Sequence, residues 1–182
     1  MSLQIPIALP SWLQQLNTQP RRFSDEEEAM RWTIEASRRN VGDGGGPFAA
    51  AVLNEDLELI ALGVNRVVPD RASILHAEMF VLLLAQRRLA SHDLAALGNF
   101  TLVTSCEPCA MCFGAIPFAG VRRVVCGATK DDAQAVGFDE GDRPSHWQDS
   151  LRRRGISVQT EVLRAEAAAV LEDYKRDGGR LY

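Results

Sequence analysis

The stretch NFTLVTSCEPCAMCFGAIPFAGVRRVVCGA, residues 99–128, holds two apolar runs on either side of a segment rich in proline, cysteine and small residues. The first run (99–105) and the last (121–128) have the length and apolar character of buried strands, and 108–120 between them predicts a short helix. A helix between two strands is the repeating unit of an α/β sheet. This stretch therefore sets the fold class that the rest of the chain has to fit.

Other segments extend the predicted sheet and cover it with helices. Residues 48–53 and 57–64 predict a hairpin, and a further strand is expected near 158–163. Helices are expected at 25–40, 73–90, 164–176 and, shorter, near 132–136. Because a hairpin joins strands that otherwise alternate with helices, we predict an α/β three-layer α/β/α sandwich with a central mixed five-stranded sheet.

Local signals suggest where the helices begin and how the chain is divided. Ser24 followed by Glu27 resembles a capping box for the first helix, and Ser73 is the expected cap of the second. The whole chain is expected to form a single domain. Within it, residues 1–23 are expected to be an irregular arm, because prolines interrupt them, and residues 164–182 a C-terminal helix and tail.

The composition limits what the protein can bind and where it works. The 182 residues carry a net charge of −4, and a sequence pI of about 5.4 makes nucleic acid or an anionic membrane an unfavourable partner. The basic run at 152–154 is interpreted as a solvated helix end. The longest apolar run, MFVLLLA, is too short to span a bilayer, and the start does not resemble a signal peptide. We expect a cytoplasmic protein with reduced cysteines.

Three of the four cysteines occur in CEPCAMC, where two overlapping pairs have the spacing of metal ligands. Pro108 favours the first position of a helix and makes Glu107 before it extended. The helix is therefore expected to begin at Pro108, with Cys109 and Cys112 on one face of its first turn. Free N–H groups at a helix start favour thiolates. Cys106 is left outside, on the turn from strand to helix.

A third metal ligand has to come from one of the three histidines. His92 follows the end of a predicted helix and His146 lies in a predicted loop, and both are interpreted as surface residues. His76 is expected in the first turn of its helix, where a glutamate follows it at two residues. If the two helix starts meet, one Zn²⁺ would have three protein ligands and a fourth position for water. These ligands are His76, Cys109 and Cys112.

The motif HAE at 76–78 together with PCAMC at 108–112 resembles the signature of the zinc-dependent nucleobase deaminases. The likeness extends to the bacterial guanine deaminases, because GGPFAAAV, VNRVV, HAE, TSCEPCAMCFGAI and GFDEG follow one another in the order typical of them. It covers roughly residues 44–141, with a weaker match in the terminal helix and the final tyrosine. The resemblance implies a cytidine deaminase-like fold, one Zn²⁺ per chain, and hydrolysis of guanine to xanthine and ammonia.

The resemblance also implies roles for individual residues. Glu78 would take a proton from the attacking water and deliver protons to the ring and the leaving amine. An amide that both donates and accepts suits a heterocycle edge, and a carboxylate accepts from the ring N–H groups of guanine. The residues expected to contact the base are Phe48, Asn65, Ala77, Glu140 and Tyr182. The family further implies a homodimer, in some members with the final helix exchanged between subunits.

Other interpretations of these motifs stay open. The same metal site would serve a cytosine deaminase, a tRNA adenosine deaminase or an enzyme that also acts on aminotriazines, although the acidic pI disfavours tRNA. A more distant alternative is a non-enzymatic zinc or iron–sulfur module that uses all four cysteines, Cys126 included. That module leaves HAE unexplained, and Cys126 in an apolar strand is typical of a buried free cysteine.

Overall fold

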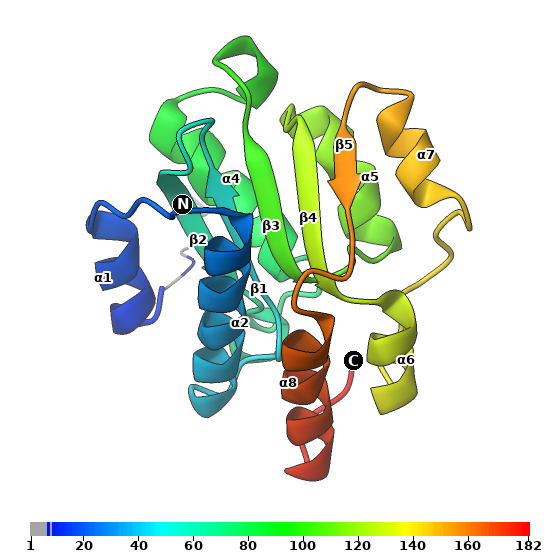
Figure 1. Cartoon of the computed structure of the whole chain (residues 1–182). Helices are drawn as coiled ribbons and strands as arrows, with labels where there is room; N and C mark the ends of the chain where they lie inside the picture. Colours follow the sequence, from blue (N-terminus) through cyan, green and yellow to red (C-terminus); the bar gives the residue numbers. More distant parts are fainter. Residues whose placement is uncertain (1–6, 8) are drawn as a thin grey trace, which may run out of the picture.

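A five-stranded mixed sheet forms the centre of the computed structural model, which describes residues 7 and 9–182 (Figure 1). Its strands are β1 (Ala49–Leu53), β2 (Leu59–Val64), β3 (Thr101–Cys106), β4 (Arg123–Ala128) and β5 (Ser157–Gln159). They lie in the order β2-β1-β3-β4-β5, with β1 antiparallel to both of its neighbours and the last three strands parallel. The predicted mixed five-stranded sheet is confirmed.

Helices cover both faces of this sheet and complete three layers (Figure 1). They are α1 (Ser11–Thr18), α2 (Glu26–Gly42), α3 (Val67–Asp70), α4 (Ala77–Leu89), the 3₁₀ helix η1 (Leu94–Ala96), α5 (Ala110–Ala119), α6 (Lys130–Val136), α7 (Trp147–Arg152) and α8 (Arg164–Arg176). Alternate residues of β1 face opposite layers. Ala49 and Ala51 pack with α2 and α8, whereas Ala50 and Val52 pack with α4, α5 and α7. The predicted α/β/α sandwich is confirmed.

The strand register brings several chain segments to one edge of the sheet. The first residues of β1 pair with the last residues of β2 and β3, because both neighbours run antiparallel to it. Cys106 and Ala128, at the ends of the parallel strands β3 and β4, pair with each other. The carboxyl ends of parallel strands are the usual place for a ligand in an open α/β sheet. Phe48, just before β1, therefore lies at the same edge as Asn65 and Glu107, which directly follow β2 and β3.

The N-terminal arm contains a helix that the sequence did not predict, because prolines interrupt this part of the chain. The predicted irregular arm, residues 1–23, lies partly outside the described residues, at 1–6 and 8, and its described part contains α1. Asn17 of this helix donates to the carbonyl of Leu62 at 2.9 Å and accepts from the N–H of Leu62 at 2.8 Å. The side chain therefore satisfies backbone groups on the free edge of β2. The prediction of an irregular arm is wrong for the residues of α1.

The N-cap of α2 lies one residue later than predicted. Asp25 is the cap, and its carboxylate accepts from the N–H of Glu28 at 2.8 Å. In return, the Glu28 carboxylate accepts from the N–H of Ser24 at 2.7 Å. Asp and Ser cap helices about equally well, so the spacing alone did not distinguish the two pairs. The predicted pairing of Ser24 with Glu27 is wrong.

The helix α4 begins four residues after Ser73, so the predicted Ser73 cap is also wrong. The chain before α4 forms turns, and the carbonyl of Leu75 accepts from the N–H of Arg66 at 2.9 Å. This bond holds the segment against the residue that follows Asn65, and it keeps the chain out of the helix. His76 is therefore the extended residue before α4 and not part of its first turn.

The helix α5 begins at Ala110, and the predicted start at Pro108 is wrong. Cys109 is extended, with ψ of 176°, and takes the N-cap position. The carbonyl of Pro108 accepts from the guanidinium of Arg143 at 2.7 Å. Because this tertiary bond occupies the Pro108 carbonyl, the helix starts two residues later than the proline indicates.

The C-terminal part follows the prediction in its helices more closely than in its strand. The helix α8 has the predicted bounds and packs against α2, α6 and β4 of its own chain. The helix α7 was predicted as a loop, and only its basic end at 152–154 was anticipated. The strand β5 is shorter than the predicted segment 158–163 and begins one residue earlier. Among the described helices, none combines the length and the apolar character that crossing a bilayer requires.

We expect Asn17→Ala to lower the free energy of unfolding by about 1–2 kcal/mol, because two hydrogen bonds to the edge of β2 are lost. Urea unfolding followed by circular dichroism measures the change. Gln14→Ala on the exposed side of the same helix is the matched control. Equal midpoints for Asn17→Ala and Gln14→Ala would show that α1 does not brace the sheet.

Candidate active site

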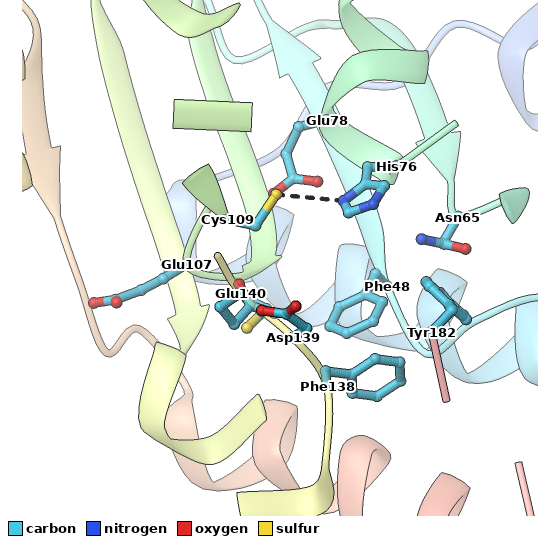
Figure 2. A pocket seen from close by; sticks show the side chains of 11 residues that line it. Phe48, Asn65, His76, Glu78, Glu107, Cys109, Phe138, Asp139, Glu140 and Tyr182 are labelled. Atoms are coloured by element: carbon cyan, nitrogen blue, oxygen red, sulfur yellow. Dashed lines mark hydrogen bonds between the residues drawn. The ribbon is translucent and has the colours of Figure 1, made fainter. Parts of the chain in front are cut away.

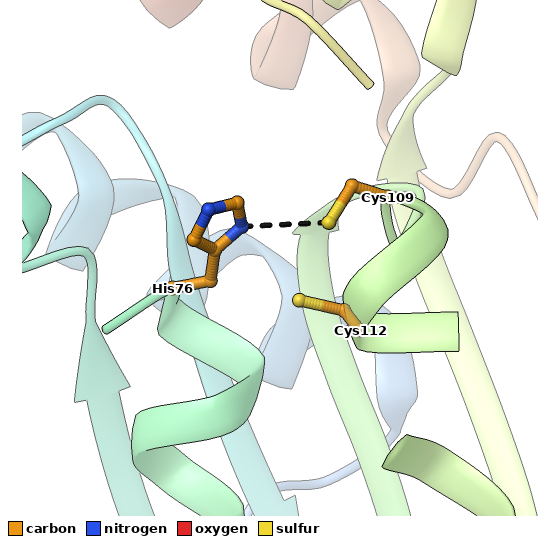
Figure 3. A group of neighbouring side chains, drawn as sticks. All are labelled: His76, Cys109 and Cys112. Carbon is orange, nitrogen blue, oxygen red and sulfur yellow. Dashed lines mark hydrogen bonds between the residues drawn. The ribbon is translucent and has the colours of Figure 1, made fainter. Parts of the chain in front are cut away.

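Three side chains suited to a metal meet where β3 and β4 end (Figure 3). The Nδ1 of His76 lies 3.5 Å from the Sγ of Cys109. One ligand atom each from His76, Cys109 and Cys112 lies within 4.8 Å of the others. His76 immediately precedes α4, Cys109 immediately precedes α5, and Cys112 lies in the first turn of α5. The two helix starts therefore meet, as the sequence analysis expected.

The electrostatics of this group depend on the two neighbouring sulfurs. Interaction with the Cys112 thiol, together with the contact to His76, lowers the pKa of Cys109 to about 4. The same interaction and burial raise the pKa of Cys112 well above its usual range. Burial opposes a charge on His76, but the contact with Cys109 and the charge of Glu78 outweigh it and raise the pKa of His76. Without a metal, only one of the two cysteines, Cys109, is readily ionised to a thiolate. A divalent cation would stabilise both Cys109 and Cys112 as thiolates.

The donor set fits zinc. Tetrahedral bonds of about 2.0 Å to nitrogen and about 2.3 Å to sulfur place the two atoms about 3.5 Å apart, which is the separation found here. One imidazole and two thiolates form a known catalytic ligand set that leaves a fourth position open. Among the described residues, Cys106 and Cys126 lie outside the group, and the Cys106 Sγ lies 3.6 Å from the carbonyl of Thr129. His92 and His146 are exposed, as predicted.

Glu78 turns its carboxylate toward the metal-binding group from the first turn of α4 (Figure 2). The residue is 6% exposed. Burial and the charge of Cys109 raise the pKa of Glu78 to about 7, whereas a divalent cation at the triad would act in the opposite direction. A carboxylate that titrates near neutrality is suited to accepting a proton and returning it.

A small cavity adjoins the metal-binding group, and aromatic rings form one of its walls (Figure 2). The ring of Phe138 meets Phe48 edge to face at 4.8 Å and Tyr182 at 5.4 Å between centroids. Asn65 lines another side and is 1% exposed. The remaining space is about 20 Å³, which is room for a water molecule. Phe48, Asn65 and Tyr182, which are distant in sequence, therefore share one pocket.

The C-terminal tail is fastened over this pocket. The hydroxyl of Tyr174 donates to the carbonyl of Arg180 at 2.8 Å, and Tyr182 beyond it lines the cavity. The hydroxyl of Tyr182 is buried and has no hydrogen-bond partner in the described structure. A Cβ at Gly46 would lie 2.0 Å from that hydroxyl and 2.9 Å from the Oδ1 of Asn65, so glycine at this position leaves the space that both side chains occupy. A buried polar atom without a partner indicates a place where a ligand can bond.

Both acidic residues of GFDEG border the pocket, and of the two only Glu140 is buried. It is 6% exposed, and burial together with the charges of Cys109 and Glu78 raises the pKa of Glu140 to about 8. Its backbone carbonyl accepts from the N–H of Ala110 at 2.9 Å, which ties the turn to the start of α5. Asp139 beside it is exposed, and its carboxylate accepts from a backbone N–H within the turn.

Sequence reasoning and structure differ on three other residues. The side chain of Ala77 is buried in the apolar cluster between the sheet and α4, so a contact between its backbone and a base stays a prediction. Phe138 lines the cavity but was missed, because only the acidic residues of GFDEG were considered. Asn40 was also missed. It is fully buried and donates to the carbonyls of Gly46 and Asn65 at 2.8 Å, which joins two walls of the pocket.

Comparison with known families agrees with this geometry. The family model described as the cytidine and deoxycytidylate deaminase zinc-binding region matches residues 23–128, which is more than half of the chain. The match includes His76, Glu78, Cys109 and Cys112, and it ends at the last residue of β4. The chain belongs to this family of zinc-dependent deaminases.

Individual relatives are similar over most of their length. The solved guanine deaminase of Nitrosomonas europaea is 48% identical, with a TM-score of 0.94 over 97% of this chain and 98% of that chain. A solved structure in complex with 2,6-diaminopurine is 49% identical, with a TM-score of 0.94 over 97% and 95% of the two chains. The guanine deaminase of Bacillus subtilis is 38% identical over 117 residues, which are 64% of this chain and 72% of that protein.

We expect the purified protein to hold about one Zn²⁺ per chain and to lose it in the variant Cys112→Ala, which removes one of the three grouped ligand atoms. Mass spectrometry of dialysed protein measures the metal content. Cys106→Ala is the matched control, because it removes a neighbouring sulfur that lies outside the group. Zinc retained by Cys112→Ala and lost by Cys106→Ala would exclude this ligand set.

Proposed function

We propose that the protein catalyses the hydrolytic deamination of guanine to xanthine and ammonia. The observation that carries this proposal is the position of Glu140, a buried carboxylate that lines the same cavity as Glu78 and the metal-binding group. The similarity to two guanine deaminases supports the same substrate. The class of substrate is thus a purine with ring N–H donors, and the place of the reaction is purine catabolism.

His76, Cys109 and Cys112 are the residues that would hold the metal. When bound by such ligands, zinc lowers the pKa of a coordinated water toward about 7 and so supplies a nucleophile at neutral pH. Glu78 contacts the Cys112 side chain and lines the same cavity as His76 and Cys109, so its carboxylate would take the proton of the attacking water. It then delivers protons to the ring nitrogen and to the amine, which leaves as ammonia from a tetrahedral ring carbon.

The other walls of the cavity match the remaining features of guanine. The Glu140 carboxylate accepts from ring N–H groups, and such bonds favour its charged form against the effect of burial. Asn65 offers an amide that can donate to the purine and accept from it. Phe48, Phe138 and Tyr182 provide an apolar surface for a flat ring. The unpartnered hydroxyl of Tyr182 is available to a polar atom of the base.

The size of the cavity implies that binding involves movement of its walls. A space of about 20 Å³ holds a water molecule and not a purine. Tyr182 lines this space, and the segment that carries it, residues 177–182, lies outside the helices and strands. We therefore infer that the tail opens to admit the base and closes over it afterwards. We infer that the chain forms one deaminase domain, and that its C-terminal helix and tail complete the site.

Ammonia release from a panel of bases tests the proposal. The panel contains guanine, adenine, cytosine, their nucleosides, aminotriazines and an adenosine-containing tRNA anticodon stem. We expect the highest kcat/KM with guanine, because Glu140 matches its donors, and slower turnover of aminotriazines that carry a similar ring amidine. Turnover of cytosine or adenosine without turnover of guanine would overturn the substrate and leave the metal site intact.

The variant Glu78→Gln is expected to lower kcat by about 100- to 10,000-fold, because the amide cannot carry the proton. It should keep its zinc and its melting temperature, since the shape of the side chain is preserved. Stopped-time assays of xanthine formation and metal analysis of the same sample measure both properties. Turnover at the parent rate would rule out Glu78 as the proton carrier.

The variant Glu140→Gln is expected to lower kcat/KM for guanine by about 10- to 100-fold, because a charged acceptor of two donors becomes a neutral amide. Asp142→Asn changes a nearby carboxylate that is exposed and is not among the lining residues of the cavity, and it serves as the control. Xanthine formation at limiting guanine measures the ratio. Similar ratios for the two variants would remove the basis for guanine selectivity.

We further propose a cytoplasmic homodimer. Four free cysteines suit a reducing compartment, and an apolar face over α4 and α5 suits a second copy of the chain. Ile74, Leu83 and Phe118 are exposed there, Phe118 to 80%, around a hollow of about 440 Å³. Light scattering is expected to give twice the chain mass of 20.0 kDa, and Phe118→Glu is expected to give a monomer. A parent protein at 20.0 kDa would exclude the dimer.

A further inference from the structure

A buried ion pair lies directly behind the wall of the pocket. The Nη2 of Arg143 is 2.7 Å from the Oε2 of Glu107, and their side chains are 5% and 9% exposed. The guanidinium also lies over the ring of Trp147, at 4.4 Å from the ring centroid. In Figure 2 the side chain of Glu107 points away from the pocket. Glu107 borders the cavity, but its carboxylate is directed to Arg143, which is not among the lining residues.

The pair connects the metal-ligand loop to the turn that carries Glu140. Glu107 and Pro108 immediately precede Cys109 in the chain. The guanidinium of Arg143 donates through Nη2 to the Glu107 carboxylate and through Nη1 to the Pro108 carbonyl, both at 2.7 Å. Arg143 is itself three residues after Glu140. The planar guanidinium therefore spans both segments with two parallel donors, which an ammonium group cannot do.

Further bonds fix the two ends of this connection. The N–H of Glu107 donates to the carbonyl of Ala128 at 2.8 Å, and its carboxylate accepts from the N–H of Lys130 at 3.2 Å. The Glu107 carboxylate is thus held near the end of β4 by a bond that does not involve Arg143. On the other side, the Glu140 carbonyl accepts from the start of α5. The turn is held to the ligand loop at two points, one on each side of Gly141.

Stability alone does not explain such a pair. Removing two charges from water costs several kcal/mol, and apolar residues of similar volume are often as stable. Glu107 and Arg143 therefore have to be explained by what they hold in place. Resting on the proposed function, we propose that Arg143 is a positioning residue, which through Glu107 and Pro108 sets the position of the Glu140 carboxylate relative to the metal ligands.

A double-mutant cycle on the zinc-loaded protein tests this role. Arg143→Lys keeps the positive charge and loses the planar fork, and we expect it to lower kcat/KM for guanine by about 10- to 100-fold. In the Glu140→Gln background the same substitution should cost less than about 3-fold, because the carboxylate that it positions is already gone. Zinc content should stay at that of the parent in all four proteins.

Two further variants separate positioning from stability. Arg143→Met leaves Glu107 buried and unpaired, so it should lower the melting temperature, and the double variant Glu107→Gln with Arg143→Met should restore it without restoring kcat/KM. Arg123→Met removes a second Arg–Glu pair, with Glu26, at the far end of β4. This control should lower the melting temperature and leave kcat/KM within about 2-fold of the parent.

Amide hydrogen exchange gives a readout that needs no substrate. Arg143→Lys is expected to raise exchange about 10-fold or more in a peptide covering 137–143, whereas Arg123→Met should leave that peptide unchanged. Equal losses of kcat/KM in both Glu140 backgrounds, or parent-like exchange in Arg143→Lys, would overturn the inference. A parent protein that does not deaminate guanine would instead refute the proposed function, and the exchange result would still decide the role of Arg143.

Discussion

The close contact between α4 and β2 is the constraint on which the rest of the structure depends. A Cβ at Gly63 would lie 2.7 Å from the backbone nitrogen of Val81, so the helix rests on the strand without an intervening side chain. This close packing fixes α4 on the sheet, and the start of the helix brings His76 to the edge at which β3 and β4 end. The start of α5, which packs in the same layer as α4, places Cys109 and Cys112 at that edge. The metal-binding group is thus a consequence of how closely two helices pack on one sheet.

The same edge collects more negative charge than its protein groups can balance. Two carboxylates, Glu78 and Glu140, are buried within one cavity beside two sulfurs that are suited to thiolates. Burial and the charge of Cys109 raise the pKa of both carboxyl groups, and the charge of Glu78 adds to the effect on Glu140. A divalent cation held by His76, Cys109 and Cys112 would offset this cost, because its charge is opposite in sign to the charges of the thiolates and carboxylates. The groups for metal binding, for proton transfer and for recognition of a base therefore interact electrostatically within one site. The Arg143–Glu107 pair holds the metal-ligand loop and the Glu140 turn at fixed positions.

Much of this arrangement could be predicted from the sequence, and the errors have a common cause. Hydrophobic periodicity gave the sheet and most helices, and HAE with PCAMC gave the three residues that the structure brings together. The starts of α4 and α5 were misplaced, because Leu75 and Pro108 bond to distant residues. The same holds for Asn17, Asn40 and Arg143, whose side chains bond to backbone groups far away in the chain or across the fold. Hydrophobic periodicity and local sequence signals do not show which distant residues will form such hydrogen bonds.

The central claim is that one imidazole and two thiolates form an open metal site at the sheet edge. Zinc K-edge absorption of the protein loaded with one equivalent of zinc tests it most directly. We expect two sulfur neighbours at about 2.3 Å and two nitrogen or oxygen neighbours at about 2.0 Å, one from His76 and one from water. Three or four sulfur neighbours would mean that Cys106 or Cys126 joins the site, and would contradict it.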